Sequence, residues 1–306
     1  MQVLVIRGSG FIGRHLIARL VADGHFVSVP TRRYAHGRAL LPLPTVTLHS
    51  GDVHREETLA PLVEKADVVV NLVGVLHSRN GTPWGPDFDK AHVQLPEMLA
   101  RLCCRYKVSH FVHISALGVS IDAPSAYLRS KMEGESRIQN IFAASQMRNW
   151  TIFRPSVVFG PDDRFMNLFA QLACWMPVLF IAGAESRLQP VFVGDVAKAI
   201  TAVMRQSRHF GQVYDLAGPE VYTLAELVAR AARWGGHPRP VIGLPASVGR
   251  LQAYFLEKLP GEPLMSRDNL ESLKVDNVSA TPMPASLDMI PTPLEAVAPR
   301  YLARWR

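Results

Sequence analysis

The chain has few cysteines, no long apolar run and no basic cluster. Its 306 residues include only Cys103, Cys104 and Cys174, which form neither a CxxC pair nor a Cys/His set with metal-ligand spacing. We therefore expect no disulfide framework, no metal site and a reducing compartment. No apolar run approaches the roughly 20 residues that a membrane-spanning helix needs, so no membrane span is expected.

Positive charge is in excess but is not concentrated. Lys and Arg number 33 against 26 Asp and Glu, which gives a net charge of +7. Such a balance can favour anionic ligands, nucleic acid or an anionic membrane surface. The densest basic spots are only Arg32 with Arg33 and Arg304 with Arg306. Because no basic run follows a phosphate backbone, we expect no nucleic-acid partner.

The composition is that of a globular protein with a large buried core. Hydrophobic residues make up 48% of the chain and charged residues 19%. An apolar run begins one residue after Met1, so we expect no signal or transit peptide and predict a cytoplasmic protein.

Short β-branched runs alternate with amphipathic helical patterns through about two thirds of the chain. The runs lie at residues 2–6, 25–30, 45–49, 67–74, 110–115 and 150–155. The first helical pattern ends at Gly24, a residue type that often terminates helices. Parallel strands need crossover helices and are buried on both faces, so the pattern predicts an α/β fold with a doubly wound parallel sheet, a Rossmann fold.

The later part of the chain mixes helical patterns with proline-rich connections. We expect residues 1–160 to form an NAD(P)-binding domain that is completed by residues 187–217, with a strand near 212–218 returning to the main sheet. The remainder, residues 161–186 and 218–306, is expected to form a smaller lobe for a substrate or a partner.

A glycine-rich segment follows the first apolar run. GSGFIG supplies Gly8, Gly10 and Gly13 in the G-x-G-x-x-G spacing, between a strand and a helix. These glycines permit a tight turn and a close approach of the backbone to a pyrophosphate, whose charge the helix N-terminus attracts. The alternative is a tight turn without a ligand, but the position in a βαβ series favours dinucleotide binding.

Two arginines, Arg32 and Arg33, stand at the end of the second run, where NAD-binding proteins carry an acid for the ribose hydroxyls. Guanidinium groups there can bind a 2′-phosphate, so NADP(H) is predicted in preference to NAD(H), which stays possible. The alternative is a pair of solvated arginines at a strand end.

The segment YLRSK places Tyr127 and Lys131 four residues apart on one face of a predicted helix. An ammonium close to a phenol favours the phenolate, so Lys131 is expected to lower the pKa of the tyrosine toward a range useful for acid/base chemistry. The spacing is common by chance, but here it follows the fifth apolar run. Tyr127 and Lys131 are therefore the candidate catalytic pair.

Other features have simpler explanations. His77, His110 and His113 are expected to be ordinary strand and loop histidines. A helical pattern at 246–259 has an apolar stripe that usually packs against its own lobe, and a membrane-surface or partner contact is the alternative. The members of this stripe are Val248, Leu251, Phe255 and Leu259.

Several segments together resemble the extended or atypical short-chain dehydrogenase/reductases, which are NAD-dependent epimerase/dehydratase-like proteins. The glycine-rich segment, Asp52 after the third run, NLVG at 71–74, YLRSK at 127–131 and FRPSVVFGP at 153–161 carry this resemblance, which covers nearly the whole chain. More narrowly, GPDDRFMNLFA at 160–170 resembles the branch that holds the nucleotide-binding accessory subunit of respiratory complex I and its bacterial relatives.

The resemblance, taken with the glycine motif, implies a set of cofactor contacts. The pyrophosphate would meet Gly8, Ser9, Gly10, Phe11, Ile12 and Gly13, and the adenine would meet Asp52 and Val53. The nicotinamide ribose would lie over Leu72, Val73 and Gly74, while the ring would meet Tyr127, Lys131, Ser115, Pro155, Ser156 and Val157.

Three positions depart from the pattern of the family. Arg7 stands at its first glycine, where a non-glycine residue requires ordinary backbone dihedrals. Arg7 is expected to be tolerated and to lean its charge toward the phosphates, and weaker cofactor binding is the alternative. Ala116 replaces the catalytic serine and His92 the active-site asparagine, so Tyr127 is the main donor for a substrate oxygen, with His92 or Ser125 as further candidates.

Two functions from different classes follow. The first is an NADP(H)-dependent oxidoreductase or nucleotide-sugar epimerase acting on a small carbonyl, sugar-nucleotide or quinone-like substrate. The alternative is a non-catalytic nucleotide-binding accessory, assembly or sensor protein that contacts a respiratory complex or a membrane surface. The Tyr127 and Lys131 pair favours the first, and Ala116 favours the second.

Overall fold

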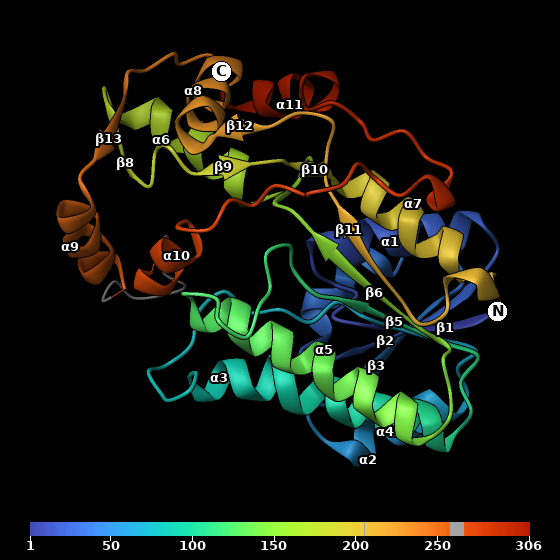
Figure 1. Ribbon diagram of the computed structural model, residues 1–306. Helices are drawn as coiled ribbons and strands as arrows, with labels where there is room; N and C mark the ends of the chain where they lie inside the picture. The colour runs from blue at the N-terminus through green and yellow to red at the C-terminus, as the bar shows by residue number, and fades with distance from the viewer. Residues whose placement is uncertain (205, 258–265) are drawn as a thin grey trace.

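A seven-stranded parallel sheet lies at the centre of the computed structural model, which describes residues 1–204, 206–257 and 266–306 (Figure 1). The strand order is β11-β6-β5-β4-β1-β2-β3. The bounds are β1 Gln2–Ile6, β2 Phe26–Thr31, β3 Val46–Ser50, β4 Val68–Asn71, β5 His110–Ile114, β6 Trp150–Pro155 and β11 Gln212–Leu216. The predicted α/β fold and the return of a strand near 212–218 are confirmed.

The inner strands are buried because their side chains alternate between two apolar layers. Val3 and Val5 of β1 pack toward α1 (Phe11–Ala22) and α7 (Val193–Val203), while Leu4 and Ile6 pack on the opposite face. That opposite face is covered by α2 (Glu56–Glu64), α4 (Leu95–Arg105) and α5 (Ala126–Ala144). Burial on both faces explains the continuous apolar runs in the sequence.

The sheet changes direction beside its first strand. From β1 the chain winds outward through β2 to β3 and then crosses back, so that β4 pairs with β1 on its other side. In open α/β sheets, ligands bind outside the carboxyl ends of the strands at this switch point. The crevice between the ends of β1 and β4 is therefore the place where the topology favours a ligand.

A second layer of short elements packs around its own core. Its helices are α6 (Phe165–Trp175), α8 (Leu224–Trp234), α9 (Ala246–Leu256), α10 (Arg267–Ser272) and α11 (Leu294–Leu302). Its two-stranded sheets pair β8 (Leu179–Ala182) with β13 (Val241–Leu244), β9 (Arg187–Leu188) with β12 (Tyr222–Thr223), and β7 (Val158–Phe159) with β10 (Val191–Phe192). Figure 1 shows this layer above the carboxyl ends of the central strands.

Short segments complete the chain and shape the site. They are α3 (Pro86–Phe88), a π-helical turn η2 (Asp89–Gln94) that leads into α4, and the 3-10 turns η1 (Tyr34–Leu40), η3 (Ser207–His209), η4 (Ala285–Leu287) and η5 (Ala303–Trp305). π-helical turns are rare and often occur at functional sites. This one carries His92, one of the three positions that depart from the family pattern.

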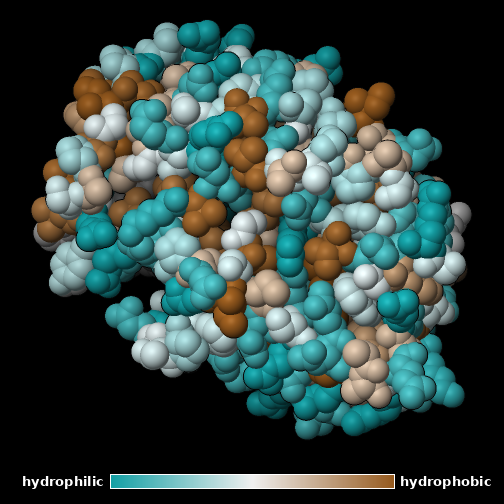
Figure 2. Space-filling view, viewed as in Figure 1, coloured by the Kyte–Doolittle hydropathy of each residue, from teal (hydrophilic) through white to brown (hydrophobic). Residues whose placement is uncertain are grey.

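Exposed apolar side chains gather on one side of the second layer. Figure 2 shows hydrophobic atoms over β8, β13 and α9, and the exposed residues there include Phe180, Ile242, Val248 and Leu251. Val248 and Leu251 are 46% and 57% exposed, so these two members of the predicted stripe do not pack inside their own lobe. The side chain of Phe255 and the whole of Leu259 lie outside the described residues.

Candidate dinucleotide site

The glycine turn between β1 and α1 is shaped to hold an anion. Helix α1 begins at Phe11 with Gly10 as its N-cap, no side chain caps it and no acidic residue lies in its first turn. The first amides of the helix therefore keep unused hydrogen-bonding capacity, and the helix dipole favours negative charge there. A Cβ on Gly13 would lie 2.3 Å from the Gly8 carbonyl oxygen, so the helix packs on the turn only because position 13 is glycine.

Arg7 adopts a conformation that we did not predict. Its φ is +62°, in the left-handed region, which costs a non-glycine residue roughly 1 to 2 kcal/mol. The expectation of ordinary dihedrals was therefore wrong, because the turn after β1 keeps the shape that a glycine adopts freely. The Arg7 side chain lies against Gly10, and its guanidinium donates a hydrogen bond to the Gly74 carbonyl oxygen.

Lys131 lies beneath the same crevice. Its side chain is 2% exposed, and Nζ donates to the carbonyl oxygens of Val73 at 3.1 Å and Ile114 at 2.9 Å. Burial lowers the pKa of this ammonium to about 7, with Glu135 opposing the shift and Arg7 adding to it. The lysine is thus held at the ends of β4 and β5 in a state that can lose its proton near neutral pH.

Tyr127 is placed one turn before Lys131, but its pKa moves in the opposite direction from the prediction. Burial raises the pKa of the phenol to about 12, while Arg7 lowers it and Asp268 raises it further. Arg7 is the group that offsets this shift, while the ammonium of Lys131 donates to the backbone carbonyls of Val73 and Ile114. The expected lowering of the pKa by Lys131 was wrong for this structure, and the phenol is a proton donor at neutral pH.

The side chain of His92 connects the segment after β4 with helix α5. Its Nε2 accepts a hydrogen bond from the Val75 amide at 3.0 Å, so Nδ1 carries the proton that it shares with Ser130 Oγ at 2.9 Å. Burial, with the charge of Lys131, lowers the pKa of this imidazole well below its usual value, so the ring is neutral. His92 therefore fixes the segment after β4 to helix α5.

Ser125 is likewise used by the fold. Its hydroxyl caps α5 by accepting a hydrogen bond from the Leu128 amide at 3.2 Å. His92 is not free to bond a substrate oxygen in this arrangement, because the Val75 amide and Ser130 Oγ engage its two ring nitrogens. The Ser125 hydroxyl accepts one hydrogen bond and is fully buried within the cap of α5. Tyr127 remains as the candidate donor.

Ser115 offers a buried hydroxyl that the described part of the chain leaves without a partner. It lies just after β5 with 4% of its surface exposed, and its Oγ makes no hydrogen bond there. Buried polar groups are nearly always satisfied, so an unpaired hydroxyl beside the crevice suits a polar ligand group. The neighbouring Ala116 packs with Ala123 and Leu128 and supplies no hydroxyl.

The segment Pro155 to Val157, which is predicted to lie beside the nicotinamide ring, is held by a residue that the sequence analysis missed. Asn277 Oδ1 accepts hydrogen bonds from Ser156 Oγ at 2.6 Å and from the Val157 amide at 3.1 Å. Its Nδ2 donates to the Leu117 carbonyl oxygen at 3.2 Å. A single asparagine more than 100 residues away gives no sequence signal for these contacts, which depend on the path of the C-terminal segment.

Asp268 was missed for the same reason. Its carboxylate accepts the amides of Ala126 at 2.7 Å and Tyr127 at 3.0 Å, so it caps the helix that carries the candidate catalytic pair. It lies on α10, and the next residue, Asn269, donates to the Leu76 carbonyl oxygen at 3.4 Å. The second layer therefore forms hydrogen bonds both with the start of α5 and with the segment after β4.

The end of the site that is predicted to hold adenine carries two exposed arginines. Arg32 and Arg33 are exposed at the end of β2, and their side chains make no hydrogen bond or ion pair with the described residues. The pKa of the Asp52 carboxyl lies below its usual value. Burial raises this pKa, but a hydrogen bond from the His54 amide and the positive charges of His54, Lys90 and Arg32 together lower it by more.

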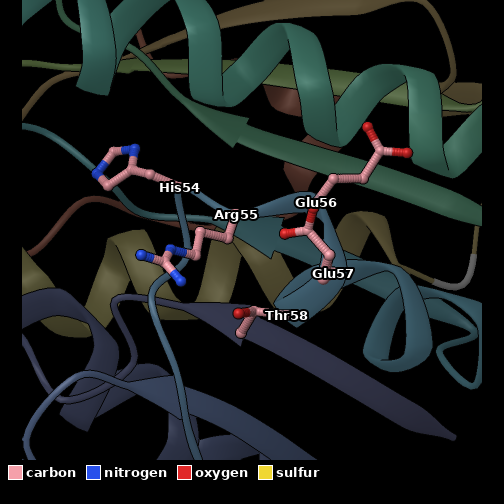
Figure 3. Close-up of a pocket in the computed structure, with 5 residues that line it drawn as sticks. All are labelled: His54, Arg55, Glu56, Glu57 and Thr58. Atoms are coloured by element: carbon pink, nitrogen blue, oxygen red, sulfur yellow. The ribbon is translucent and has the colours of Figure 1, made fainter.

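Next to Asp52 the surface is hollowed at the start of α2. The hollow has a volume of about 650 Å³ and is lined by His54, Arg55, Glu56, Glu57 and Thr58, with the two glutamates on the first turn of the helix (Figure 3). Two acidic residues in the first turn of α2 repel an anion from that helix end. This hollow is therefore not a second phosphate site.

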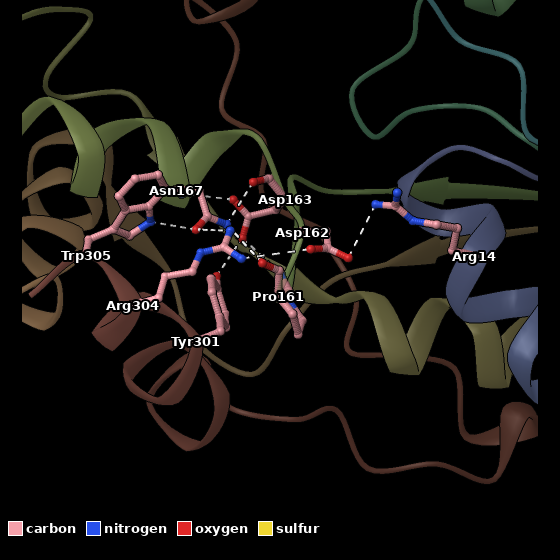
Figure 4. A network of polar contacts seen from close by, with 9 residues as sticks. Arg14, Pro161, Asp162, Asp163, Asn167, Tyr301, Arg304 and Trp305 are labelled. Carbon is pink, nitrogen blue, oxygen red and sulfur yellow. Dashed lines mark hydrogen bonds and ion pairs between the residues drawn. The ribbon is translucent and has the colours of Figure 1, made fainter. Parts of the chain in front are cut away.

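A polar network ties helix α1 to the end of the chain (Figure 4). Arg14 of α1 pairs with Asp162 at 3.3 Å, and the next residue, Asp163, accepts the Tyr301 hydroxyl at 2.6 Å. Burial raises the pKa of Asp163, although its hydrogen bonds to Tyr301 and to backbone amides oppose the shift. The segment after β7 is thereby fixed between α1 and α11.

Two features are absent from the described residues, a metal-ligand cluster and a membrane-spanning helix. No group of three or more His, Cys, Asp or Glu side chains is arranged to hold a metal ion there. Within the same residues, helices of sufficient length and apolarity to cross a bilayer were not found.

Comparison with known proteins gives the family. The model of the NAD dependent epimerase/dehydratase family matches residues 3–217, which span the whole central sheet. The chain belongs to this family.

Among curated relatives, subunit 9 of the mitochondrial NADH dehydrogenase [ubiquinone] 1 alpha subcomplex from Mus musculus is 30% identical over 311 residues, covering 99% of this chain and 80% of the relative. A ceramide reductase of Caulobacter vibrioides is 29% identical over 207 residues, covering 66% of this chain and 61% of the relative.

Solved structures agree on the fold of this epimerase/dehydratase family member. UDP-glucuronic acid 4-epimerase from Bacillus cereus, in complex with UDP-glucuronic acid and NAD, has a TM-score of 0.70 at 20% identity, with both chains covered in full. The epimerase Mth375 of Methanothermobacter thermautotrophicus has a TM-score of 0.76 at 18% identity, covering 99% of this chain and 91% of that structure. The predicted Rossmann fold and the predicted family are thus confirmed.

The structure brings most predicted site residues of this epimerase/dehydratase family member to one crevice. The glycine turn, Leu72 to Gly74, Tyr127 and Lys131 surround the carboxyl ends of β1, β4 and β5. Asp52, Val53, Arg32 and Arg33 follow β2 and β3 at the far end of the same edge.

Proposed function

We propose that the protein binds a nicotinamide dinucleotide in the crevice between the carboxyl ends of β1 and β4. One observation carries the proposal: the uncapped N-terminus of α1, cradled by glycines, lies at the switch point of the sheet. The orphaned hydroxyl of Ser115 and the buried Lys131 support the fit, because both offer polar groups to a ligand there.

The residues that would hold the cofactor follow from their positions. The amides of residues 8 to 13 would bind the diphosphate, and Asp52 with Val53 would lie at the adenine. Leu72, Val73 and Gly74 would support the nicotinamide ribose, with Ser115 and Pro155 to Val157 beside the ring. Because Asn277 already holds Ser156 and Val157, these two residues would present a fixed wall rather than free donors.

We propose NADP(H) as the preferred form, with NAD(H) possible. Arg32 and Arg33 have no partner among the described residues and follow β2, where an adenosine ribose lies in Rossmann folds. Two free guanidinium groups at that point can bind a 2′-phosphate. We also propose a cytoplasmic location. A contact with a respiratory complex or a membrane surface belongs to the second function below.

The proposed reaction is that of an oxidoreductase or nucleotide-sugar epimerase acting on a small carbonyl, sugar-nucleotide or quinone-like substrate. When bound, the nicotinamide supplies or accepts a hydride at a carbon that bears oxygen. Tyr127, protonated at neutral pH, donates its hydroxyl proton to the oxygen of a carbonyl that is being reduced. Arg7 then stabilises the phenolate by its positive charge.

A second candidate is a non-catalytic nucleotide-binding accessory, assembly or sensor protein. Ala116 supports it, because no hydroxyl stands at the position of the family's catalytic serine and neither His92 nor Ser125 replaces it. The similarity to a subunit of a mitochondrial NADH dehydrogenase supports it as well. The exposed apolar residues over β13 and α9 would then be a contact surface for a partner.

One variant separates the two functions. Tyr127→Phe removes the proton donor but keeps the ring that packs 5.4 Å from His92, so cofactor affinity is expected to stay within about twofold. If the protein is an enzyme, turnover of NADPH with a panel of carbonyl and sugar-nucleotide substrates falls by at least about 100-fold. Tyr34→Phe, at an exposed tyrosine, is the matched control.

The binding proposal is tested first, by titrating NADPH and NADH while following the fluorescence of the reduced ring. Binding of neither nucleotide would refute the proposed site. Binding without any turnover that depends on Tyr127 would favour the accessory function.

A further inference from the structure

Two cations converge on Gly74 from different elements. Arg7, in the turn after β1, donates a hydrogen bond to the Gly74 carbonyl oxygen. From α5, Lys131 Nζ lies 3.5 Å from the position that a Cβ on Gly74 would take. Since Gly74 follows β4, both charges lie at the switch-point crevice, one from each side.

Neither cation has a carboxylate partner within residues 1–204, 206–257 and 266–306. Arg7 is bonded there to a backbone carbonyl, and Lys131 is bonded to two. Glu135, one turn after Lys131, is held by Arg154 at 2.6 Å, and Asp268 is held by the amides that begin α5. The positive charge at Gly74 is therefore not neutralised by an ion pair.

This charge has a consequence for the nicotinamide ring, which is positive when oxidised and uncharged when reduced. The two forms are otherwise nearly identical in shape, so a cation beside the ring discriminates between them by charge alone. We infer that Arg7 makes the crevice select the reduced nicotinamide dinucleotide over the oxidised one. The inference rests on the proposed binding of a nicotinamide dinucleotide.

Arg7 is the residue of interest because it departs from the glycine pattern that the family motif favours. It adopts a φ of +62° despite the steric cost to a non-glycine residue. A positive charge about 10 Å from the oxidised ring, at an effective dielectric of about 20, raises the Kd of the oxidised nucleotide by roughly tenfold. That is the contribution expected of Arg7 to the ratio of the two dissociation constants.

The test compares variants that differ in charge but not in backbone cost. Arg7→Lys and Arg7→Gln both keep a non-glycine residue at the left-handed position, and only the second removes the positive charge. Calorimetry gives the Kd of NADPH and NADP⁺ for each protein. The ratio of the oxidised to the reduced Kd is expected to be about tenfold lower in Arg7→Gln than in the wild type, and to be retained in Arg7→Lys.

Arg19→Gln is the matched control, because it removes one positive charge from the last turn of α1, away from the crevice. Its ratio is expected to equal that of the wild type. Arg7→Gly, which removes both the charge and the backbone cost, is the second variant and should behave as Arg7→Gln does.

The outcomes separate this inference from the proposed function. If the wild type binds both redox forms and the ratio is unchanged in Arg7→Gln and Arg7→Gly, the selection by Arg7 is refuted while dinucleotide binding stands. If the wild type and the variants bind neither form, the proposed function fails and the inference fails with it.

Discussion

At the scale of single residues, burial decides the chemistry of the site more than sequence spacing does. Lys131 is bonded to two carbonyls and nearly inaccessible to solvent, so its pKa falls to about 7. Tyr127, on the same helix face, has its pKa raised to about 12. The i, i+4 spacing predicted their proximity correctly, but the environment of each group sets the direction of its pKa shift.

Lys131 makes stability depend on pH. Its pKa is depressed from 10.5 when unfolded to about 7 when folded, so between these values the unfolded chain binds more protons. The free energy of unfolding is therefore expected to rise as pH increases from about 7 to 9.5. The groups that act on Lys131 are Glu135 and Arg7, and His92 and His113 face it as neutral rings.

Urea unfolding at several pH values measures this effect. Lys131→Met is expected to flatten the rise, because the variant has no ammonium to bury. Lys65→Met, at an exposed lysine, should keep the slope of the wild type. A slope that survives in Lys131→Met would show that another group is responsible.

Arg32 and Arg33 give a second prediction at this scale. The double variant Arg32→Gln, Arg33→Gln removes two guanidinium groups that have no partner in the described residues, so stability is expected to change by less than about 0.5 kcal/mol. The Kd of NADPH should rise by at least about tenfold, while that of NADH changes by less than about threefold. An equal loss for both nucleotides, measured by fluorescence titration, would contradict a role in 2′-phosphate recognition.

At the scale of elements, α5 depends on a cap from a distant part of the chain. Ser125 caps one amide of its first turn, and the Asp268 carboxylate accepts two others. A carboxylate at a helix N-terminus is stabilised by both the hydrogen bonds and the helix dipole. The position of Tyr127 at the start of α5 is thus fixed by α10.

Asp268→Ala is expected to lower the free energy of unfolding by about 1 to 2 kcal/mol, because two amides of α5 lose their acceptor. Asp268→Asn keeps one acceptor oxygen and should cost less. Asp122→Ala, in the exposed loop before α5, is the control. Chemical denaturation of the three variants checks the order, and equal stability of Asp268→Ala and the wild type would exclude the cap.

The turn η2 carries His92 at the position of the family's asparagine, and the histidine has a structural role there. His92 lies within it, and its ring reaches both the Val75 amide and Ser130 Oγ. A Cβ on Gly134 of α5 would lie 2.0 Å from the His92 carbonyl oxygen, so α5 packs directly on this turn. The family's asparagine position is used here to join two elements of the site.

At the scale of the whole molecule, the C-terminal segment holds the two layers together. Tyr301 of α11 bonds the buried Asp163, Asn277 bonds the segment after β6, and Asp268 bonds α5. These three contacts connect residues separated by more than 100 positions. The site is consequently assembled only when the last third of the chain is folded onto the sheet.

Tyr301→Phe tests this connection. The variant removes a 2.6 Å hydrogen bond from a buried carboxylate, so the free energy of unfolding is expected to fall by about 1 to 3 kcal/mol. Hydrogen exchange of the amides in residues 160–167 should become faster as well. Tyr34→Phe, at an exposed tyrosine, should change neither quantity.

Much of this architecture was determined by the sequence itself. The six apolar runs matched the first six strands of the sheet within a few residues, and the inner strands among them are continuously apolar because they are buried on both faces. Gly8, Gly10 and Gly13 located the turn, and the 127 and 131 spacing located one face of α5. These are local patterns, and local patterns follow from backbone sterics and periodicity.

The tertiary structure alone decided the rest. The left-handed Arg7, the raised pKa of Tyr127 and the use of His92 and Ser125 by the fold depend on what each group packs against. Asp268 and Asn277 reach the site only because the chain returns across the sheet after a long excursion. Contacts between residues so far apart leave no periodic trace in one sequence, since they are set by how the elements pack together.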